Sequence, residues 1–373
     1  MSDPQLAVFE AAIADRWVID GEVGRGSRAI VYYRAREVAS GESVAIKVFR
    51  SDLASAVDTA RFAAQMRRTA EIRHENIVPI LEVSNAAGRL FLVMPFVDGE
   101  SLRSRLHREG RLELTEAIDV ARQVAEALGH AHAAGALHKD VKPENIVLSE
   151  SRALLMDLGV ARAITRSMEE TMTGSGLTLG SPGYMSPEHA RGGVEIDARA
   201  DLYSLGCVLY EMLAGAPPFT GETPLAVLRK TVYETPVPVT AIRDTLSPEV
   251  DVALDRLLAK APSARYPDAA HLVDALSARL RQRVVCDSDR SRCRNVDQDQ
   301  FARDYRQLRC ADADLTGERS RETRGRLVDV PAERNSSQGH ARSWPPFESA
   351  VPGAEPAEDH RQPPAGRGVV HAR

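Results

Sequence analysis

The chain has 373 residues, of which 43% are hydrophobic and 27% charged, as is ordinary for a globular protein with one large domain or two moderate ones. The net charge of -5 gives no general electrostatic reason to bind nucleic acid. The N-terminus lacks the basic start and long apolar core of a signal peptide, and the strongest apolar run, 90–97, is too short to cross a bilayer, so we expect a cytoplasmic protein without a membrane span.

The first hundred residues read mainly as strands. Three short β-rich runs separated by turns predict an antiparallel sheet, and they lie at 17–23, 30–38 and 43–49. The turns are Gly24-Arg25-Gly26 and Ser40-Gly41. A helical pattern follows over 58–73, and 90–97 is typical of a buried strand.

Helices dominate from Leu112 onward. The periodic segments are 114–135, 200–215 and 267–283; the second is apolar nearly throughout and is expected to be buried on all sides. Cys207 lies in it as a core residue. After about residue 283 the chain is charged and rich in Pro and Gly, which predicts disorder. We interpret the arginines there as a solvated tail, and Cys286, Cys293 and Cys310 as reduced thiols without zinc-site spacing.

Two segments of the expected sheet have features of a nucleotide site. The Gly-rich turn in VGRGSRAIVYYRA, 23–35, would let backbone N–H groups approach phosphates, although such a turn alone is more often just a tight turn. Ala29 stands where a third glycine is usual. Lys47 ends the run VAIK. It could extend from a sheet edge to water, but its place soon after the turn favours a charge directed at phosphates.

The stretch LHKDVKPENIVL, 137–148, sets polar residues between apolar runs, although ionic groups are costly to bury unless paired. The residue types suit phosphoryl transfer. Asp140 would orient a hydroxyl and accept its proton, Lys142 would offset charge on the phosphoryl group, and Asn145 would bind a metal through its carbonyl oxygen. Asp157, in LLMDLGVAR, adds a hard oxygen ligand that suits Mg²⁺. Each motif alone could be a polar turn, but the ordered series indicates a catalytic site.

In this order the segments resemble the eukaryotic-like (Hanks-type) protein kinase family, specifically bacterial serine/threonine kinases. The resemblance covers roughly residues 17–281 and rests on the motifs GRGSRAIV, VAIK, RHENIVPI, LHKDVKPENIVL, MDLG, GSPGYMSPEHA, DLYSLGCVLYEMLAGAPPF and KAPSARYPDAAHL. It implies an α+β, bilobal protein-kinase fold with a β-rich N-lobe at about 17–97, an α-helical C-lobe at about 98–281 and an ATP cleft between them. Residues 1–16 would form an N-terminal arm, and 282–373 a disordered tail.

The resemblance also implies roles for individual residues. Asp140, Lys142 and Lys47 would be catalytic, and Asn145 and Asp157 would hold the metal. The ATP-binding set would be Val23, Gly24, Arg25, Gly26, Val31, Ala45, Lys47, Met94, Pro95 and Val97. Lys47 would hold the α- and β-phosphates, Met94 would be the gatekeeper, and the backbone of Pro95 and Val97 would bind adenine. Structural roles would fall to Gln65, to Asp201 on the catalytic-loop backbone, and to an ion pair of Glu188 with Arg265.

Substrates and cofactors follow from the same resemblance. It implies ATP with Mg²⁺, or Mn²⁺ as an alternative, protein substrates with Ser or Thr, and a homodimer for trans-autophosphorylation. The hydroxyl-rich stretch between Ala161 and Ser181 suits a mobile activation loop. The candidate phosphosites in it are Thr171, Thr173, Ser175 and Thr178, with Lys139 as the local acceptor of the phosphate charge.

Four positions depart from the family pattern. Lys139 replaces the arginine of H-R-D, Leu158 the phenylalanine of D-F-G, and Ser181 a common threonine. Gln65 occupies the place of the helix glutamate that pairs with the strand lysine. This change is the most serious because it removes a charge, and we predict that it lowers basal activity without abolishing it.

The leading hypothesis is an active serine/threonine kinase, because Lys47, Asp140, Asn145 and Asp157 are all present. The main alternative is a pseudokinase, an ATP-binding scaffold with weak or no transfer activity because of Gln65. A third reading is a small-molecule kinase of similar fold. It is weaker because GSPGYMSPEHA resembles a docking loop for protein substrates.

Overall fold

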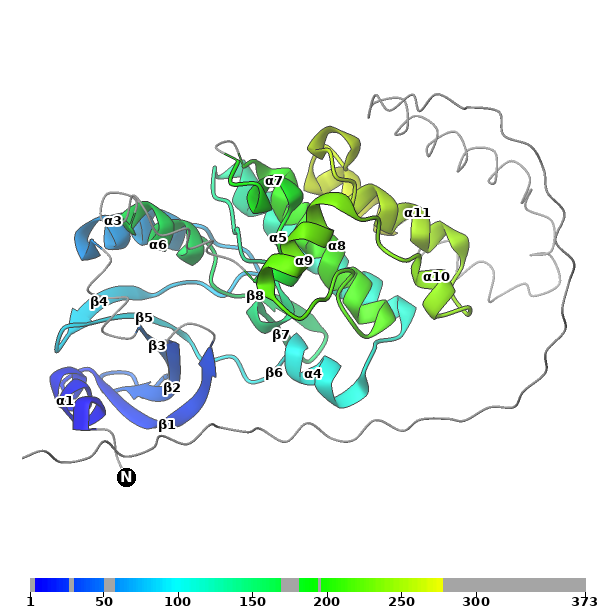
Figure 1. Ribbon diagram of the computed structural model, residues 1–373. Coiled ribbons are helices and arrows are strands. Elements are labelled where there is room, and N and C mark those ends of the chain that lie inside the picture. The colour runs from blue at the N-terminus through cyan, green and yellow to red at the C-terminus, as the bar shows by residue number, and fades with distance from the viewer. Residues whose placement is uncertain (1–3, 27–29, 50–57, 169–180, 194–195, 278–373) are drawn as a thin grey trace, which may run out of the picture. The chain divides into compact units, whose positions relative to one another are not determined.

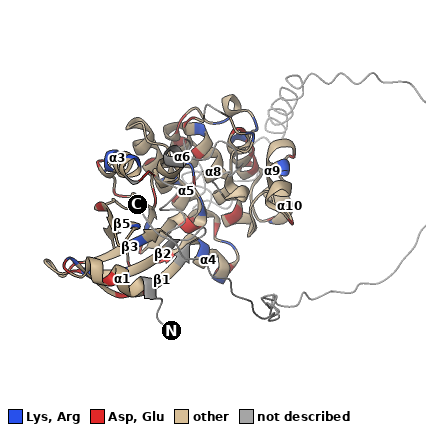
Figure 2. Ribbon diagram, turned by 60° about the vertical axis from the view of Figure 1, so that its left-hand side comes forward, with Lys and Arg blue, Asp and Glu red and all other residues tan. Residues whose placement is uncertain are grey.

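The computed structural model describes residues 4–26, 30–49, 58–168, 181–193 and 196–277. Every described residue belongs to one compact unit, which lies within Met1–Ala311. No helix among these residues is both long and apolar enough to span a bilayer. Figure 2 shows that acidic and basic residues are interspersed over the sheet and the helices. The predicted tail, 282–373, lies outside the described residues.

The β-rich runs form a five-stranded antiparallel sheet in the order β1-β2-β3-β5-β4 (Figure 1). Gly41 (φ 74°) and Gly88 (φ 73°) lie in the turns before β3 and β5, where glycine adopts a left-handed conformation without strain. The hairpins predicted over 17–49 and the strand predicted at 90–97 are confirmed. The strands are β1 (Trp17–Gly26), β2 (Ile30–Glu37), β3 (Ser43–Phe49), β4 (Glu82–Ala86) and β5 (Arg89–Pro95).

Helix α1 (Pro4–Ile13) covers one apolar face of this sheet. Phe9 of α1 is 0% exposed and meets the Phe91 ring edge to face, with centroids 5.4 Å apart. Trp17 contacts the same Phe91 ring at 5.7 Å. Residues 1–16 were expected to be an arm. The part that the structure describes is instead a helix docked on the sheet, because Phe9 and Ile13 bury apolar surface there.

Helices α3 (Thr59–Ala70) and α6 (Val160–Met168) cover the other face. Asp58 caps α3 by accepting from the backbone N–H groups of Ala60 and Arg61, as N-cap aspartates do. Buried residues of both helices form one cluster with the sheet: Phe62, Met66, Val160, Ala163 and Ile164. The stretch after 160 was expected to be a mobile loop. Its first part is helical, because apolar residues at helical spacing find a partner in α3.

Helices build the rest of the unit, and α5 and α8 lie at its core (Figure 1). All residues of α8 from Ala200 to Leu213 are buried, as the apolar sequence predicted. Helix α11 packs closely on α8, because a Cβ at Gly206 would lie 2.8 Å from the Leu257 Cβ. The helices are α4 (Leu102–Glu109), α5 (Leu114–Ala133), α7 (Pro187–Ala190), α8 (Ala198–Ala214), α9 (Pro224–Tyr233), α10 (Val239–Ile242) and α11 (Pro248–Leu257); residues 269–277 are also helical.

A small antiparallel sheet carries the polar motifs. Its strands are β6 (Glu100–Ser101), β7 (Ile146–Ser149) and β8 (Arg152–Leu155), in that order. The segment 137–145 connects α5 to β7 and ends in the short 3-10 helix η1 (Pro143–Asn145). Asp157 lies two positions after the end of β8. The two polar motifs therefore flank one hairpin, which brings them together.

Candidate active site

Asp201 fixes the backbone just before Asp140. Its buried carboxylate accepts hydrogen bonds from the backbone N–H groups of His138 (2.8 Å) and Lys139 (2.7 Å) and contacts His132 Nε2 at 2.8 Å. Burial would raise the pKa of Asp201, but His132 and His138 hold it below its usual value. The bonded loop keeps Lys139 at a φ of 64°, which is uncommon for a residue with a side chain.

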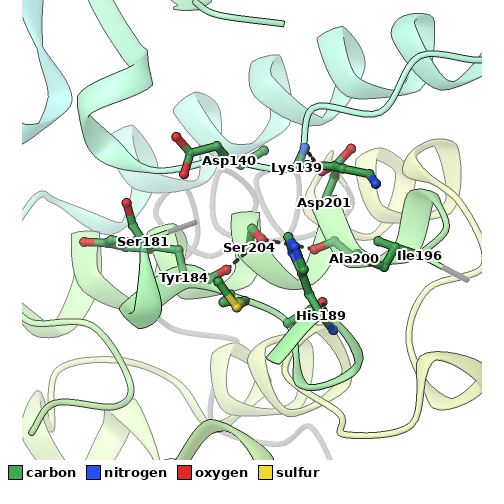
Figure 3. A pocket seen from close by; sticks show the side chains of 12 residues that line it. Lys139, Asp140, Ser181, Tyr184, His189, Ile196, Ala200, Asp201 and Ser204 are labelled. Atoms are coloured by element: carbon green, nitrogen blue, oxygen red, sulfur yellow. Dashed lines mark hydrogen bonds between the residues drawn. The ribbon is translucent and has the colours of Figure 1, made fainter. Parts of the chain in front are cut away.

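Asp140, Lys142 and Asn145 form one bonded group. The Lys142 ammonium donates to Asp140 Oδ2 at 2.6 Å and to Ser181 Oγ at 3.1 Å. The Asn145 amide donates to the Asp140 carbonyl at 2.8 Å and to Asp140 Oδ2 at 3.3 Å. Asp140 and Ser181 border a pocket that is also lined by Lys139, Tyr184, His189 and Asp201 (Figure 3). The loop thus places a carboxylate, a cation and an amide within hydrogen-bond distance of one another.

Lys47 lies on β3 and forms an ion pair with Asp157. Its Nζ is 2.6 Å from Asp157 Oδ2, and the two side chains are 2% and 9% exposed. Burial would lower the pKa of Lys47, but Asp157 raises it above the usual value. The same cation keeps the pKa of the buried Asp157 low. Tyr32 donates to Asp157 Oδ2 at 3.4 Å. Burial and then Asp157 raise the pKa of Tyr32 to about 12, so its hydroxyl stays protonated.

One oxygen of Asp157 has no protein partner. Oδ1 is buried and accepts no hydrogen bond from the described residues, and a buried polar atom without a partner is unusual in a folded protein. Asn145 uses its amide nitrogen as a donor, which leaves its carbonyl oxygen for another ligand. Two hard oxygens from these residues suit a divalent cation that obtains its other ligands from phosphates and water.

The other residues of the expected nucleotide site are only partly brought together. Ala45 and Met94 are cross-strand partners on the face that carries Lys47, and Val97 packs on the same cluster. Pro95 pairs with Val44 at the end of β5. Val31 does not join them, because it packs on the opposite face under α1. Tyr32 instead pairs with Lys47 across β2 and β3.

Residues of the Gly-rich turn are described mainly through their backbone. Val23, Gly24, Arg25 and Gly26 belong to β1, and the Val23 side chain is 58% exposed. A Cβ added at Gly24 would meet nothing within 4 Å, so the backbone there is open to a ligand.

Comparison with known proteins decides the family. The model of the protein kinase domain matches residues 17–275. The chain belongs to the protein kinase family. Among similar proteins are the serine/threonine-protein kinases PknB of Mycobacterium leprae, 38% identical over 291 residues (75% of this chain, 46% of the relative), and of Mycobacterium tuberculosis, 40% identical over 266 residues (70% and 42%). A serine/threonine-protein kinase of Mycolicibacterium smegmatis named PknB is 38% identical over 266 residues (70% and 42%).

These relatives are bacterial serine/threonine kinases, as the motifs indicated, and the bilobal fold expected from them is confirmed. The chain spans less than half the length of each of these relatives. Helix α1 lies before the matched residues, which begin at 17. Helix α1 therefore lies outside the part of the chain that matches the family model.

Gln65 lies on α3 and is partly exposed. Within the described part of the kinase, Lys47 bonds to Asp157 and Tyr32 contacts both, while Gln65 makes no hydrogen bond to Lys47. Its backbone carbonyl accepts from Thr69 Oγ1 at 3.4 Å. Gln65 therefore does not substitute for the absent glutamate in this arrangement.

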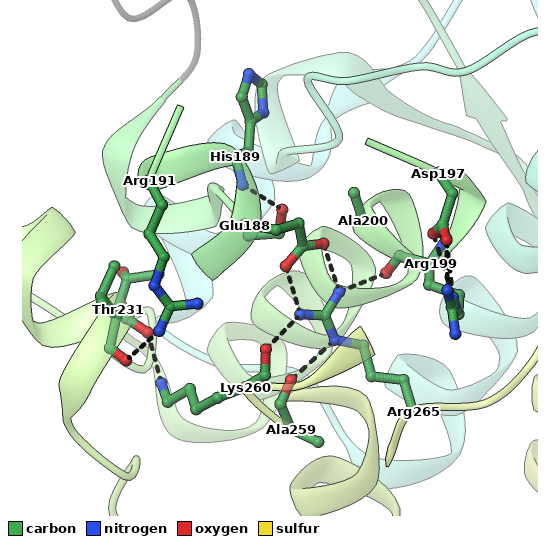
Figure 4. A network of polar contacts seen from close by, with 12 residues as sticks. Glu188, His189, Arg191, Asp197, Arg199, Ala200, Thr231, Ala259, Lys260 and Arg265 are labelled. Atoms are coloured by element: carbon green, nitrogen blue, oxygen red, sulfur yellow. Dashed lines mark hydrogen bonds and ion pairs between the residues drawn. The ribbon is translucent and has the colours of Figure 1, made fainter. Parts of the chain in front are cut away.

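Glu188 and Arg265 form a two-pronged ion pair, with both N–O distances at 2.7 Å (Figure 4). The Arg265 side chain is 0% exposed and also donates to the carbonyls of Ala259 (2.8 Å) and Arg199 (3.0 Å). Burial would raise the pKa of Glu188, but Arg265 holds it below the usual value. The pair links α7 to the segment that follows α11.

Some expected residues lie outside the described part of the chain, and some important residues were not expected. The candidate phosphosites Thr171, Thr173, Ser175 and Thr178 fall within 169–180 and are not described. Tyr32 and Arg103 were missed. Tyr32 follows Val31 on a strand, and successive side chains of a strand point to opposite faces. Tyr32 could therefore have been considered as the alternative to Val31 on the face that carries Lys47. Arg103 had no sequence signal, because its partners lie 41 to 108 positions away along the chain.

Proposed function

We propose that this chain is a serine/threonine protein kinase that transfers the γ-phosphoryl group of ATP to Ser and Thr hydroxyls of proteins. The observation that carries the proposal is the bonded group of Asp140, Lys142 and Asn145 next to the buried Lys47–Asp157 pair. Together they supply a base, two cations and two oxygen ligands, the set that phosphoryl transfer needs.

Each residue has a task in this proposal. Asp140 orients the acceptor hydroxyl and accepts its proton, while Lys142, 2.6 Å from it, offsets charge on the transferred group. Lys47 holds the α- and β-phosphates of ATP. Asn145 and the unpartnered Oδ1 of Asp157 would hold Mg²⁺, with Mn²⁺ as an alternative; the cation would neutralise developing phosphate charge.

The preference for Ser and Thr rests on Lys142, which stands where the serine/threonine members of the family carry lysine. Several sequence expectations belong to the same proposal: a kinase domain at 17–281, a tail after it, protein substrates, and a cytoplasmic location. So do a homodimer and its trans-autophosphorylation on Thr171, Thr173, Ser175 or Thr178. The tail and the phosphosites have no structural description.

The decisive experiment compares purified wild type with Asp140→Asn in Mg²⁺ and labelled ATP on a protein substrate, followed by phosphosite mapping. Loss of a general base is expected to reduce phosphorylation at least about a hundredfold, with ATP affinity preserved. Asp268→Asn, a change of an exposed aspartate outside the site, serves as the matched control. Near-full activity of Asp140→Asn would refute the assignment, phosphotyrosine as the main product would refute the specificity, and an inert wild type that binds ATP would favour the pseudokinase.

A further inference from the structure

Tyr32 joins the Lys47–Asp157 ion pair from the neighbouring strand. It lies in the middle of β2, where its backbone pairs with Gly24 on β1 and with Lys47 on β3. The Lys47 Nζ lies 5.2 Å from the centroid of the Tyr32 ring, within the range of a cation–π contact. The Tyr32 hydroxyl donates to Asp157 Oδ2 at 3.4 Å. One side chain from a strand that is paired on both sides therefore contacts both members of the ion pair.

The backbone around Asp157 is already fixed by hydrogen bonds. The Met156 N–H donates to the Asn145 carbonyl at 2.8 Å, and the Val160 N–H donates to the Asp157 carbonyl at 3.1 Å. Asp157 itself has a φ of 63°, which is uncommon for a residue with a side chain and persists only where the surroundings hold it. What remains to be set is the direction of the carboxylate.

The two oxygens of this carboxylate have different surroundings. Among the residues that the structure describes, Lys47 and Tyr32 donate hydrogen bonds to Oδ2, whereas the buried Oδ1 accepts none. An ammonium 2.6 Å from the carboxylate repels a second cation at the same group, so Lys47 has to turn to phosphate when a divalent cation binds. The Tyr32 hydroxyl then still holds Oδ2, and it carries no charge that would oppose a cation on Oδ1.

We propose that Tyr32 is a positioning residue for the divalent cation: its hydroxyl holds Oδ2 of Asp157, so that Oδ1 stays directed at the cation after Lys47 has moved to phosphate. The inference rests on the proposed kinase function and deepens it. Carboxylates that bind a metal are commonly oriented by a hydrogen bond from another residue, and loss of that residue typically lowers metal affinity about 10- to 100-fold. Tyr32 acts through Asp157 and need not touch ATP or the cation.

The test measures Mn²⁺ binding to the full chain in the presence of a non-hydrolysable ATP analogue, from the electron paramagnetic resonance signal of free Mn²⁺. Tyr32→Phe removes the hydroxyl and keeps the ring, and it should weaken Mn²⁺ binding about tenfold, the low end of the usual loss. The affinity for the analogue alone, measured in EDTA, should stay within about threefold of wild type, because no cation then uses Oδ1. A general disturbance of the nucleotide site would weaken both.

Steady-state kinetics should separate the same two effects. In Tyr32→Phe the Mg²⁺ concentration that gives the half-maximal rate should rise about tenfold, while kcat at saturating Mg²⁺ should stay within about threefold of wild type. Tyr33→Phe is the matched control, because it removes a hydroxyl from the next residue, which is 6% exposed and packs on the opposite face under α1. It should leave Mn²⁺ binding unchanged.

A second variant, Tyr32→Leu, also lacks the donor and should weaken Mn²⁺ binding at least as much; it decides the matter if Tyr32→Phe does not fold. Unchanged Mn²⁺ affinity in the folded variant would overturn the inference. So would tighter binding, which would mean that the hydroxyl competes with the cation, and so would an equal loss of affinity for the analogue alone. A wild type that binds neither the analogue nor Mn²⁺ would instead contradict the proposed function.

Discussion

At the scale of single residues, Lys47 is buried and needs an anion. Asp157 supplies it at 2.6 Å, and an unpaired ammonium in this position would lose its charge or destabilise the fold. The same carboxylate is the expected ligand of the divalent cation. The ion pair between Lys47 and Asp157 therefore competes with the expected nucleotide-bound state. In that state Asp157 would bind the divalent cation and Lys47 would bind phosphate.

Gln65→Glu is predicted to raise activity by giving Lys47 a second anion. In a competent state in which residue 65 reaches Lys47, a charge-assisted hydrogen bond would contribute about 1.5–3 kcal/mol, against about 1 kcal/mol for the neutral bond that Gln65 could accept there. If the difference acts fully on the competent state, kcat/KM rises by up to about 30-fold. The measurement is kcat/KM for wild type and variant at matched phosphorylation.

The control for this prediction is Ala64→Glu. Residue 64 is exposed on the same helix and points about 100° away, so it adds an equal charge without reaching Lys47. If Gln65→Glu gave an unchanged or lower value, or Ala64→Glu gave an equal increase, a specific pairing with Lys47 would be excluded.

The sequence predicted which polar residues of the catalytic loop lie together, and their roles stay predictions. Asp140, Lys142 and Asn145 lie within six positions of one another, so their local spacing already required them to be neighbours. Val31 shows the limit: alternation places it on one of two faces, and a shift of one residue reverses the face. The sequence could not decide that register; in the structure Tyr32, and not Val31, lies on the face that carries Lys47.

At the scale of elements, periodicity predicted α5 and the hairpins, because each buries one continuous apolar face, whereas α8 was predicted from its nearly unbroken apolar sequence. It did not predict that α6 would pack on α3, since that helix depends on a partner about a hundred positions earlier. Nor did it predict α1. Its Phe9 and Ile13 lie in a segment that includes Gln5 and Glu10 and has no clear amphipathic periodicity. Their burial depends on the apolar face of the sheet on which α1 packs.

Phe9→Ala is predicted to destabilise the kinase domain by about 3–5 kcal/mol, the usual loss when a core aromatic is truncated. Phe9 is 0% exposed and packs on Phe91. Val8→Ala is the matched control, because Val8 is 60% exposed on the same helix, and its effect should stay within about 0.5 kcal/mol. Denaturant titration of both variants measures the difference. Equal stability of the two would mean that α1 does not stabilise the sheet.

At the scale of the whole molecule, the Glu188–Arg265 pair connects segments 77 positions apart. Removing one member of a buried ion pair leaves the other charge without compensation, which typically destabilises by about 3–5 kcal/mol. Arg265→Met should therefore lower the free energy of unfolding by about that amount at pH 7. Arg199→Met breaks the more exposed pair with Asp197 and should change it by less than about 1 kcal/mol.

The effect of Arg265→Met should also depend on pH, with a sign fixed by Glu188. In the wild type the pKa of Glu188 is below its usual value, so the unfolded chain binds more protons than the folded chain near pH 4. The stabilisation by the pair is therefore fully present above the usual pKa of a glutamate and is lost as the pH falls through the lowered pKa. Without Arg265, burial raises the pKa of Glu188, and protonation then relieves the uncompensated charge. The stability difference between wild type and variant should thus be largest at pH 7 and shrink as the pH falls from the raised pKa of Glu188 in the variant to its lowered pKa in the wild type. Unfolding titrations at pH 7, 5 and 4 test this, and a difference that stayed constant or grew toward acid would show that the variant acts through lost packing rather than through the charge of Glu188.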